Sequence, residues 1–362
     1  MKKHTRSQFN QYIHQVATLN ALENTTDIAA KFTVEPSIAQ RLEAKQQESS
    51  SFLSKINLFP VDEQTGEKVG LGIERPIAST THTGEKERSP ADPTGLDNHP
   101  YRCTQTNFDT ALSYQKLDMW AKFPHFQQLI RDALIKRQAL DRIMIGFNGI
   151  KRAATSNVTQ NPLLQDVNIG WLQHIRAQAA TQVMNKIINA DGAVTSEKIR
   201  IGQGGDFANL DAFVMNAVDE LIESWFQDDT ELVVICGRAL LADKYFPIIN
   251  QNQANSESLA ADLIISQKRI GGLPAVRAPY FPANAMLITR LDNLSIYWQA
   301  GTRRRAMIDN PKRDRVENFE SVNEAYVVED YGRTAPCQHL RITIIQIAAR
   351  FIALKKHGLD QS

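Results

Sequence analysis

The stretch "FPHFQQLIRDALIKRQALDRIMIGFNG", residues 123–149, carries the strongest secondary-structure signal in the chain. Pro124 stands where the first turn of a helix tolerates a missing N–H, and Gly146 and Gly149 stand where helices end. The stretch therefore predicts a helix over residues 123–147, which at about 1.5 Å per residue is long enough to span an ordinary domain. Its apolar side chains recur at steps of three, four or seven, as on one helix face: Phe126, Ile130, Ala133, Leu140, Met144 and Phe147.

The charged residues of this helix fall outside the apolar stripe. Lys136 and Arg142 are predicted on other faces of the helix. Asp132 with Lys136, and Arg137 with Asp141, are pairs of opposite charge four positions apart, which support a helix on its polar side. Nothing beside the helix resembles a catalytic motif, so it indicates a structural rod.

The N-terminal residues predict two shorter helices. In residues 1–31 one helical face is apolar, and Thr5 and Gln8 have the spacing of a capping box at its start. Pro36 is expected to open a second, more polar helix. The first helix could simply dock on the core of the protein. Its apolar residues are Phe9, Tyr12, Ile13, Val16 and Leu19.

Residues 56–118 predict a long β-hairpin. "KINLFPV" and "KVGLGI" alternate with the period of a strand, and "NFDTALSYQKL" is expected to return as a strand. Between them, Glu74 to Pro100 form a polar segment rich in proline and glycine, far longer than an ordinary loop. Such a loop is either disordered or ordered by a partner.

The rest of the chain predicts mixed helices and strands, and therefore an α+β fold. Helices are expected over Val167 to Ala180 and over residues 209–227, and "ELVVICG" is expected to be a buried strand. A further helix is predicted in "RALLADKYFPIINQ". Strand-like segments with turns between them follow: "LPAVRAP", "AMLITRL", "LSIYWQ" and "AYVVED".

Composition excludes several classes of protein. The 362 residues include 41 basic and 40 acidic side chains, so the net charge of +1 provides no overall attraction to nucleic acid or to a membrane. Cys103, Cys236 and Cys337 are far apart and indicate neither a disulfide framework nor a thiolate zinc site. Polar residues interrupt any export signal, and no run of about 18 apolar residues occurs. We expect a cytoplasmic setting and no membrane contact.

The motifs that could carry chemistry are weak. "GQGGD", Gly202 to Asp206, precedes a helix and could hold an anion, although it lacks the lysine of a phosphate-binding loop and is better interpreted as a turn. The eight histidines are scattered, and no nucleophile signature occurs. We therefore predict no catalytic, cofactor-binding or metal-binding residues. The alternative is a cytosolic α+β enzyme with an anion site at residues 202–206.

Basic residues concentrate in "TRRRA" and "PKRDR", between Arg303 and Arg315. They could bind phosphate, which leaves a DNA-binding module as a third possibility. Glu317, Glu320 and Glu324 follow directly, so a solvated or subunit-contacting face is the favoured interpretation.

Several phrases, in order from about residue 5 to Tyr331, resemble the major capsid protein of temperate contractile-tailed phages of the peduovirus type. The departure from that pattern comes after Tyr331, where the apolar tail is longer than the ending expected for the family. The phrases are "AKFTVEPS", "QESSSFLSKIN", "GEKVGLGI", "PIASTTHT", "LIKRQALDRIMIGFNGIKRA", "NPLLQDVNIGWLQ", "LLADKYFPIIN", "LAADLIISQKRIGGLPAV" and "RVENFESVNEAYVVEDY".

The resemblance implies the capsid fold shared by tailed phages and herpesviruses, in which the predicted rod is the spine helix. It also implies removal of an N-terminal segment, and the matching junction here lies at Lys31 and Phe32. The domains expected are an N-terminal segment removed on maturation (1–31), an N-arm (32–55), an extended loop (56–118), a peripheral domain with the spine helix (119–208), a mainly axial domain (209–320), and a return strand with the divergent tail (321–362).

The function that the resemblance implies is structural. Copies of the chain would assemble into hexamers and pentamers of an icosahedral head in the bacterial cytoplasm and remain in the virion. Expected partners are further copies of the chain, a scaffold with a maturation protease, a portal, and packaged double-stranded DNA held by non-specific contact.

Overall fold

The predicted rod is present as helix α4, Phe126–Asn148. The structure is a computed structural model, and it describes residues 1–73, 78–90, 94–123, 125–188, 191, 193–241 and 269–342. The helix ends as Gly149 N–H donates to the carbonyl of Ile145 at 2.7 Å. Gly146 lies inside the helix rather than at its end. A Cβ atom at this position would approach the Trp171 ring to 2.2 Å, so glycine allows the indole to pack against the helix backbone.

By their internal contacts the residues fall into two units. Unit 1 comprises residues 1–174 and 291–330, and unit 2 comprises residues 175–290 and 331–362. The chain therefore leaves unit 1, builds unit 2, returns to unit 1 and ends in unit 2.

Unit 1 contains a sheet of seven strands among the described residues, in the order β1-β15-β16-β14-β2, with β5 and β6 also paired to β16. The 14-residue strand β16 is central because it pairs antiparallel with β15, β14, β5 and β6 along its length. β2 runs parallel to β14. The strands are β1 (Phe32–Thr33), β2 (Asn57–Val61), β5 (Thr104–Asn107), β6 (Thr110–Ser113), β14 (Leu294–Gln299), β15 (Arg304–Asn310) and β16 (Arg315–Val328).

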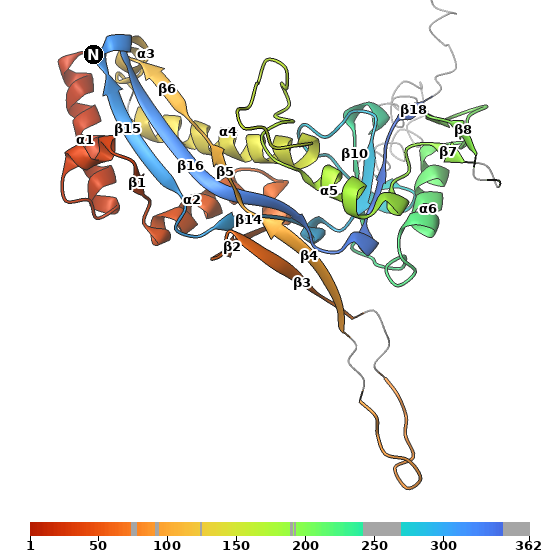
Figure 1. Ribbon diagram of the computed structural model, residues 1–362. Coiled ribbons are helices and arrows are strands. Elements are labelled where there is room, and N and C mark those ends of the chain that lie inside the picture. The colour runs from red at the N-terminus through yellow and green to blue at the C-terminus, as the bar shows by residue number, and fades with distance from the viewer. Residues whose placement is uncertain are drawn as a thin grey trace, which may run out of the picture. The chain divides into compact units, whose positions relative to one another are not determined.

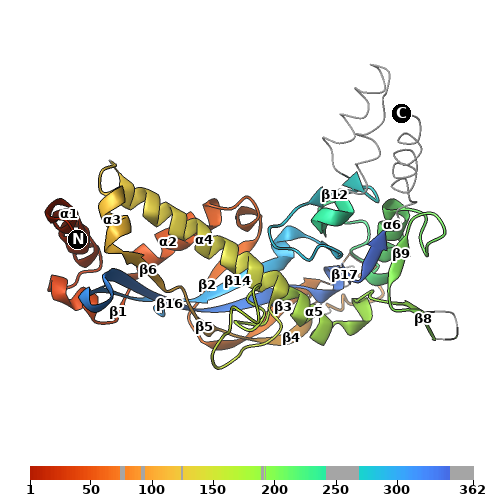
Figure 2. The same cartoon turned by 90° about the horizontal axis from the view of Figure 1, so that it is seen from above.

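The helices of unit 1 pack around this sheet, and α2 lies beside α4 (Figures 1 and 2). Pro36 occupies the first turn of α2, as predicted. Thr5 lies within α1 and does not cap it, so the predicted capping box is wrong. The buried Trp171 contacts the rings of Phe52, Phe147 and Tyr326. The helices are α1 (Lys3–Leu19), α2 (Pro36–Glu48), α3 (Tyr114–Trp120) and α4, with short 3-10 turns at Thr25–Ala29 and Leu53–Lys55; α5 (Trp171–Gln178) follows.

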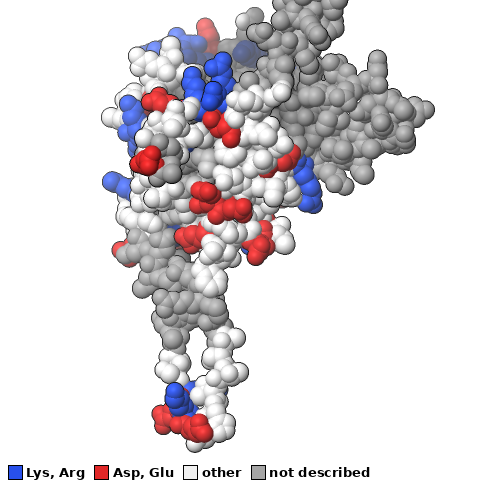
Figure 3. All heavy atoms as spheres, turned by 90° about the vertical axis from the view of Figure 1, so that its right-hand side faces the viewer, with Lys and Arg blue, Asp and Glu red and all other residues white. Residues whose placement is uncertain are grey.

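The hairpin predicted over residues 56–118 is shorter than expected. Its arms are β3 (Thr65–Ile73) and β4 (Thr94–Arg102), which pair antiparallel (Figure 1). Residues 57–61 instead pair with β14, and Tyr114–Trp120 is helical. Residues 104–107 and 110–113 pair with β16, which is long enough to take both strands along one edge. Described tip residues 78–90 are all exposed, and acidic and basic side chains gather at the tip (Figure 3).

Unit 2 is built on a sheet of five strands within the described ranges, in the order β11-β12-β10-β13-β17. "ELVVICG" supplies the buried strand β10, as predicted. Helix α6 packs its apolar face on this sheet through Phe213, Val214 and Ala217. The elements of this unit are β7 (Ile187–Ile188), β8 (Val194–Ser196), β9 (Ile199–Ile201), α6 (Leu210–Leu221), β10 (Val233–Cys236), β11 (Arg269–Ile270), β12 (Leu273–Val276), β13 (Met286–Thr289), β17 (Ala335–Cys337) and β18 (Leu340–Ile342). Short 3-10 turns lie at Ala180–Gln182 and Tyr331–Arg333 in unit 2, and at Leu291–Asn293 and Pro311–Arg313 in unit 1.

Two predicted helices are shorter than the periodicity suggests. Helix α5 covers Trp171–Gln178 instead of Val167 to Ala180, and α6 ends at Leu221 instead of residue 227. Beyond α6 the chain turns, which leaves Trp225 exposed. The helix predicted in "RALLADKYFPIINQ" lies, from residue 242 onward, outside the described residues, as do the extended-loop residues 74–77 and 91–93 and the C-terminal tail from residue 343.

Candidate functional site

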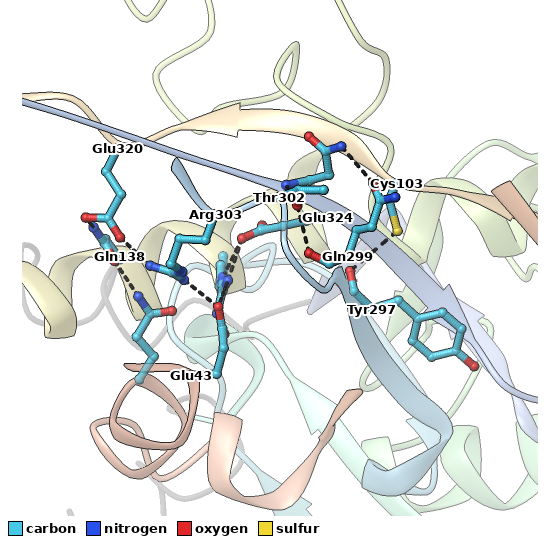
Figure 4. A network of polar contacts seen from close by, with 12 residues as sticks. Glu43, Cys103, Gln138, Tyr297, Gln299, Thr302, Arg303, Glu320 and Glu324 are labelled. Atoms are coloured by element: carbon cyan, nitrogen blue, oxygen red, sulfur yellow. Dashed lines mark hydrogen bonds and ion pairs between the residues drawn. The ribbon is translucent and has the colours of Figure 1, made fainter. Parts of the chain in front are cut away.

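A cluster of buried ion pairs connects α2, α4, β16 and the start of β15 in unit 1 (Figure 4). Arg142 on α4 lies between two carboxylates: its guanidinium contacts Glu43 of α2 at 2.5 Å and Glu324 of β16 at 2.5 Å. Arg303, directly before β15, bridges Glu43 and Glu320. Both arginines are almost completely buried.

Glutamine side chains extend this cluster. Gln138, one turn before Arg142 on α4, donates to Glu320 Oε2 at 3.2 Å and accepts from Gln46 of α2. Tyr326 places its hydroxyl 3.4 Å from Glu324 Oε2. The buried charges therefore have polar partners, and helix α2 is tied to both the rod and the central strand.

The pKa values reflect the balance between burial and ion pairing. Burial favours the neutral form of Glu43, but the attraction of Arg142 and Arg303 exceeds that effect and lowers its pKa to about 2. For Glu324, burial prevails and the pKa is raised, although Arg142 opposes this shift. Burial would lower the pKa of Arg142, but Glu324 and Glu43 hold it well above its usual range. Glu43 is thus the firmly ionised centre of the cluster.

The positions of Arg142 and Arg303 correct two predictions. Arg142 was expected away from the buried face of the rod, yet none of its side chain is exposed. The concentration between Arg303 and Arg315 does not form one solvated face: Arg303 is buried, Arg305 donates to Asn318 at 2.7 Å, and Arg315 pairs with Glu317 at 2.6 Å. Arg303 reaches Glu320 because β15 and β16 are antiparallel neighbours, whereas Arg315 and Glu317 stand two positions apart on β16 itself.

The other candidate chemical groups are engaged in structure. In "GQGGD" the Asp206 carboxylate accepts from the backbone N–H of Arg200 at 2.7 Å, which fits the interpretation as a turn. The following helix, α6, is already capped by Asn209, whose side chain accepts from Ala212 N–H. Burial raises the pKa of Cys103 and of Cys337 to about 12, so both thiols are protonated at neutral pH.

The described residues provide neither a metal site nor a membrane-spanning helix. No group of three or more histidine, cysteine, aspartate or glutamate side chains there could hold a metal ion. Among the same residues, no helix is long and apolar enough to cross a membrane.

The sequence matches the family described as "Phage major capsid protein, P2 family" over residues 8–340. The chain belongs to the P2 family of phage major capsid proteins. It is 56% identical to a sequence of Escherichia phage P2 described as "Capsid proteins", over 94% of this chain and 96% of the relative. It is 43% identical to the "Major capsid protein" of Serratia phage KSP20, over 92% of this chain and 96% of that protein.

A solved structure supports the same fold. The chain matches one in "Satellite phage P4 procapsid including size determination (Sid) protein" with a TM-score of 0.78 and 52% identity, covering 95% of this chain and 99% of that one. The fold is therefore the α+β major capsid fold of tailed phages. The protein is a structural component of the virion capsid, and the enzyme alternative is not supported. For a capsid protein, the buried cluster of Glu43, Arg142, Arg303, Glu320 and Glu324 is structural rather than catalytic, and we call it the Glu43 clamp.

The predicted processing junction lies between an apolar docking segment and a strand. Lys31 is exposed, whereas Phe32 is buried and pairs with Arg305 in β1-β15. N-terminal to the junction, α1 packs Val16 and Ala17 into a small apolar cluster. Only Lys31 of the two junction residues is therefore exposed, and Phe32, held in β1 by its pairing with β15, also packs in the same apolar cluster as Val16 and Ala17 of α1.

The base of the capsid hairpin is anchored to unit 1. Lys68 of β3 is buried and its ammonium donates to the Val328 carbonyl, at the end of β16, at 2.7 Å. Tyr101 of β4 packs edge-on against Tyr297 of β14 at 5.1 Å between ring centroids. The direction in which the two strands leave the sheet is set by these contacts.

Sequence reasoning missed the clamp residues Glu43, Arg142 and Arg303. One signal was available: in the mainly apolar final half of the rod, "ALDRIMIGF", Arg142 follows Asp141, which already has a partner in Arg137 four positions earlier, and precedes the apolar Ile143. A charge inside such a segment requires an opposite charge, but the sequence does not specify which glutamate provides it.

Proposed function

We propose that this capsid protein forms hexamers and pentamers of an icosahedral head that encloses double-stranded DNA. The observation that carries the proposal is the β3-β4 hairpin. It is anchored at its base by Lys68, yet residues 78–90 are exposed throughout. A hairpin whose tip has no core of its own is expected to gain order by lying across another copy of the chain. The match to a chain of the P4 procapsid supports assembly of this kind.

The two units support a division into a peripheral and an axial domain. We assign the peripheral domain and the spine helix α4 to unit 1 and most of the axial domain to unit 2. The expected boundaries (119–208 for the peripheral domain and 209–320 for the axial domain) differ from the division of internal contacts, which changes unit at residues 174/175 and 290/291. Residues 32–55 would be the N-arm, held by the Glu43 clamp.

We further propose that residues 1–31 act during assembly and are then removed between Lys31 and Phe32. Three features support this. The segment docks through a limited apolar cluster, and a cavity of about 130 Å³ remains beside Phe9 and Tyr12. The polar contacts of α1 are few; among them, Lys2 N–H donates to Asp118 at 2.8 Å, Arg6 pairs with Asp309, and the Tyr12 hydroxyl accepts from Arg305 at 3.2 Å. The remaining chain begins with the paired strand β1. A scaffold with protease activity, a portal and packaged DNA are the partners expected for such a head.

Coexpression with the scaffold protein tests the proposal. Electron microscopy should show closed shells with five-fold and six-fold capsomers, and N-terminal sequencing of mature heads should begin at Phe32. Heads whose subunits begin at Met1 or Lys2 would overturn the processing step. Soluble monomers without shells, under conditions in which the scaffold is present, would overturn the assembly proposal.

A further inference from the structure

The sheet of unit 2 carries opposite charges at its two ends. β13 is antiparallel to β10 and β17, so Val233 lies opposite Thr289, and Met286 lies opposite both Cys236 and Cys337. Residues just before β10 and just after β13 therefore lie at one end, which we call the acidic end. Residues just before β13 and just after β10 and β17 lie at the other end, which we call the basic end.

The acidic end surrounds an exposed tryptophan. Between α6 and β10 the chain turns, and the Trp225 side chain is 59% exposed there. Two arginines also lie at this end. Arg290, after β13, contacts Asp229 at 3.3 Å and pairs with Glu231, and Arg333, before β17, lies over the Phe226 ring at 4.3 Å, but the carboxylates outnumber them. Figure 3 shows a group of acidic side chains on this side of the molecule. The carboxylates of the last turn of α6 and the following turn are Asp219, Glu220, Glu223, Asp228, Asp229 and Glu231.

The basic end contains a recess of about 570 Å³. Its lining has no aspartate or glutamate among the described residues. Apolar lining comes from Pro282, Ala285 and Leu340, and basic lining from Arg176, Lys198, His339 and Arg341. Arg238 and Arg277 are exposed directly after β10 and β12, which run parallel, so they add positive charge at the same end.

The two ends carry opposite charges. One presents an exposed indole in a segment rich in carboxylates, and the other presents a partly apolar recess lined by guanidinium and ammonium groups. Because they lie at opposite ends of the same strands, one copy cannot satisfy both through a two-fold contact of either end with itself. A head-to-tail contact between different surfaces satisfies both ends and, if the rotation closes, generates a ring.

We propose that the acidic end of one copy docks into the basic end of the next copy, with Trp225 entering the recess. The proposal rests on the hexamers and pentamers proposed above and identifies a contact within them. The indole would serve as the aromatic anchor, and guanidinium groups such as Arg341 would be positioned to contact its face or the neighbouring carboxylates. Exposed ion pairs are individually weak, so the complementary charge mainly selects the partner surface and its orientation.

Charge reversal provides the test. One variant carries Lys198→Glu and Arg341→Glu, a second carries Asp219→Lys and Glu220→Lys, and a third combines all four substitutions. All four residues are exposed, and lysines near the C-terminus of α6 suit the helix dipole, so the subunit should fold. Circular dichroism and denaturant unfolding of each free subunit verify this. The combined variant keeps the wild-type net charge.

Each two-residue variant should lower the yield of closed shells by about tenfold or more, because like charges then meet at the contact. The combined variant should recover most of the yield. Trp225→Ala should lower the yield without changing the salt dependence of assembly. Normal yields from both two-residue variants, or loss without recovery in the combined variant, would overturn this contact while leaving the capsid function intact. Salt-dependent binding of duplex DNA that only Lys198→Glu with Arg341→Glu abolishes would also overturn it, since the basic end would then serve nucleic acid.

Discussion

Arg142 shows how a single side chain sets the relation between the arm, the rod and the sheet. Its guanidinium is buried, and taking such a charge out of water is costly unless carboxylates and hydrogen bonds surround it. Glu43 and Glu324 provide that surrounding, and Arg303, which shares Glu43, has Glu320 as its second partner. The clamp is consequently sensitive to loss of any one member.

Arg142→Met should lower the free energy of unfolding of the free subunit by about 3–5 kcal/mol, because it leaves Glu43 and Glu324 with less compensation. Arg137→Met is the matched control on the same helix. Arg137 pairs with Asp141 near the surface, so its loss should cost only about 0–1 kcal/mol. Denaturant titration gives both values. Equal losses for the two variants would mean that the clamp contributes no more than a surface pair.

Acid should weaken the clamp through Glu43. Its pKa in the folded subunit is about 2, below the ordinary value of 4.5, so ionised Glu43 stabilises the fold above pH 4.5 and this contribution is lost as the pH falls toward 2. The raised pKa of Glu324 acts in the opposite direction, since its protonation favours the folded state as the pH falls. Glu43→Gln should therefore be less stable than wild type at pH 7 and lose less of its stability on acidification. Parallel unfolding curves at pH 7, 4 and 3 provide the comparison; the same loss on acidification in both proteins would contradict the assignment.

At the scale of elements, local patterns predicted well and distant pairing did not. The period of the rod, the proline at the start of α2 and the apolar run of β10 are local properties, and the corresponding elements are present. Strand β15 was missed because "RRRAMIDN" is too charged to resemble a strand. Arg303, directly before the strand, pairs with Glu43, 260 residues away, and the residues of β15 pair with β16. Only the tertiary fold brings these charges together.

The hairpin allows a test at the same scale. Residues 78–90 of the free subunit should exchange their amide hydrogens rapidly, because they are exposed and build no core, and they should become protected in the shell. Deleting residues 80–92 should leave subunit stability within about 0.5 kcal/mol while reducing the yield of heads. The β3-β4 base near Lys68 is the internal reference and should be protected in both states. Strong protection of the tip in the free subunit would mean that it packs on its own chain.

At the scale of the whole molecule, the capsid must hold together through many repeated contacts. We expect no covalent links between subunits. The three cysteines are buried, and the raised pKa values of Cys103 and Cys337 keep these thiols protonated and slow to form disulfides. The Lys68 amine at the hairpin base is likewise buried and bound to a carbonyl. Burial at symmetric interfaces, repeated over the shell, is then the source of strength.

Mature heads boiled in denaturant with reductant should migrate as single subunits on a denaturing gel, and the same heads without reductant should do so too. A ladder of linked subunits under reducing conditions would reveal a covalent bond other than a disulfide and would contradict the prediction. A ladder seen only without reductant would contradict it too, and would show that the buried cysteines become accessible during assembly.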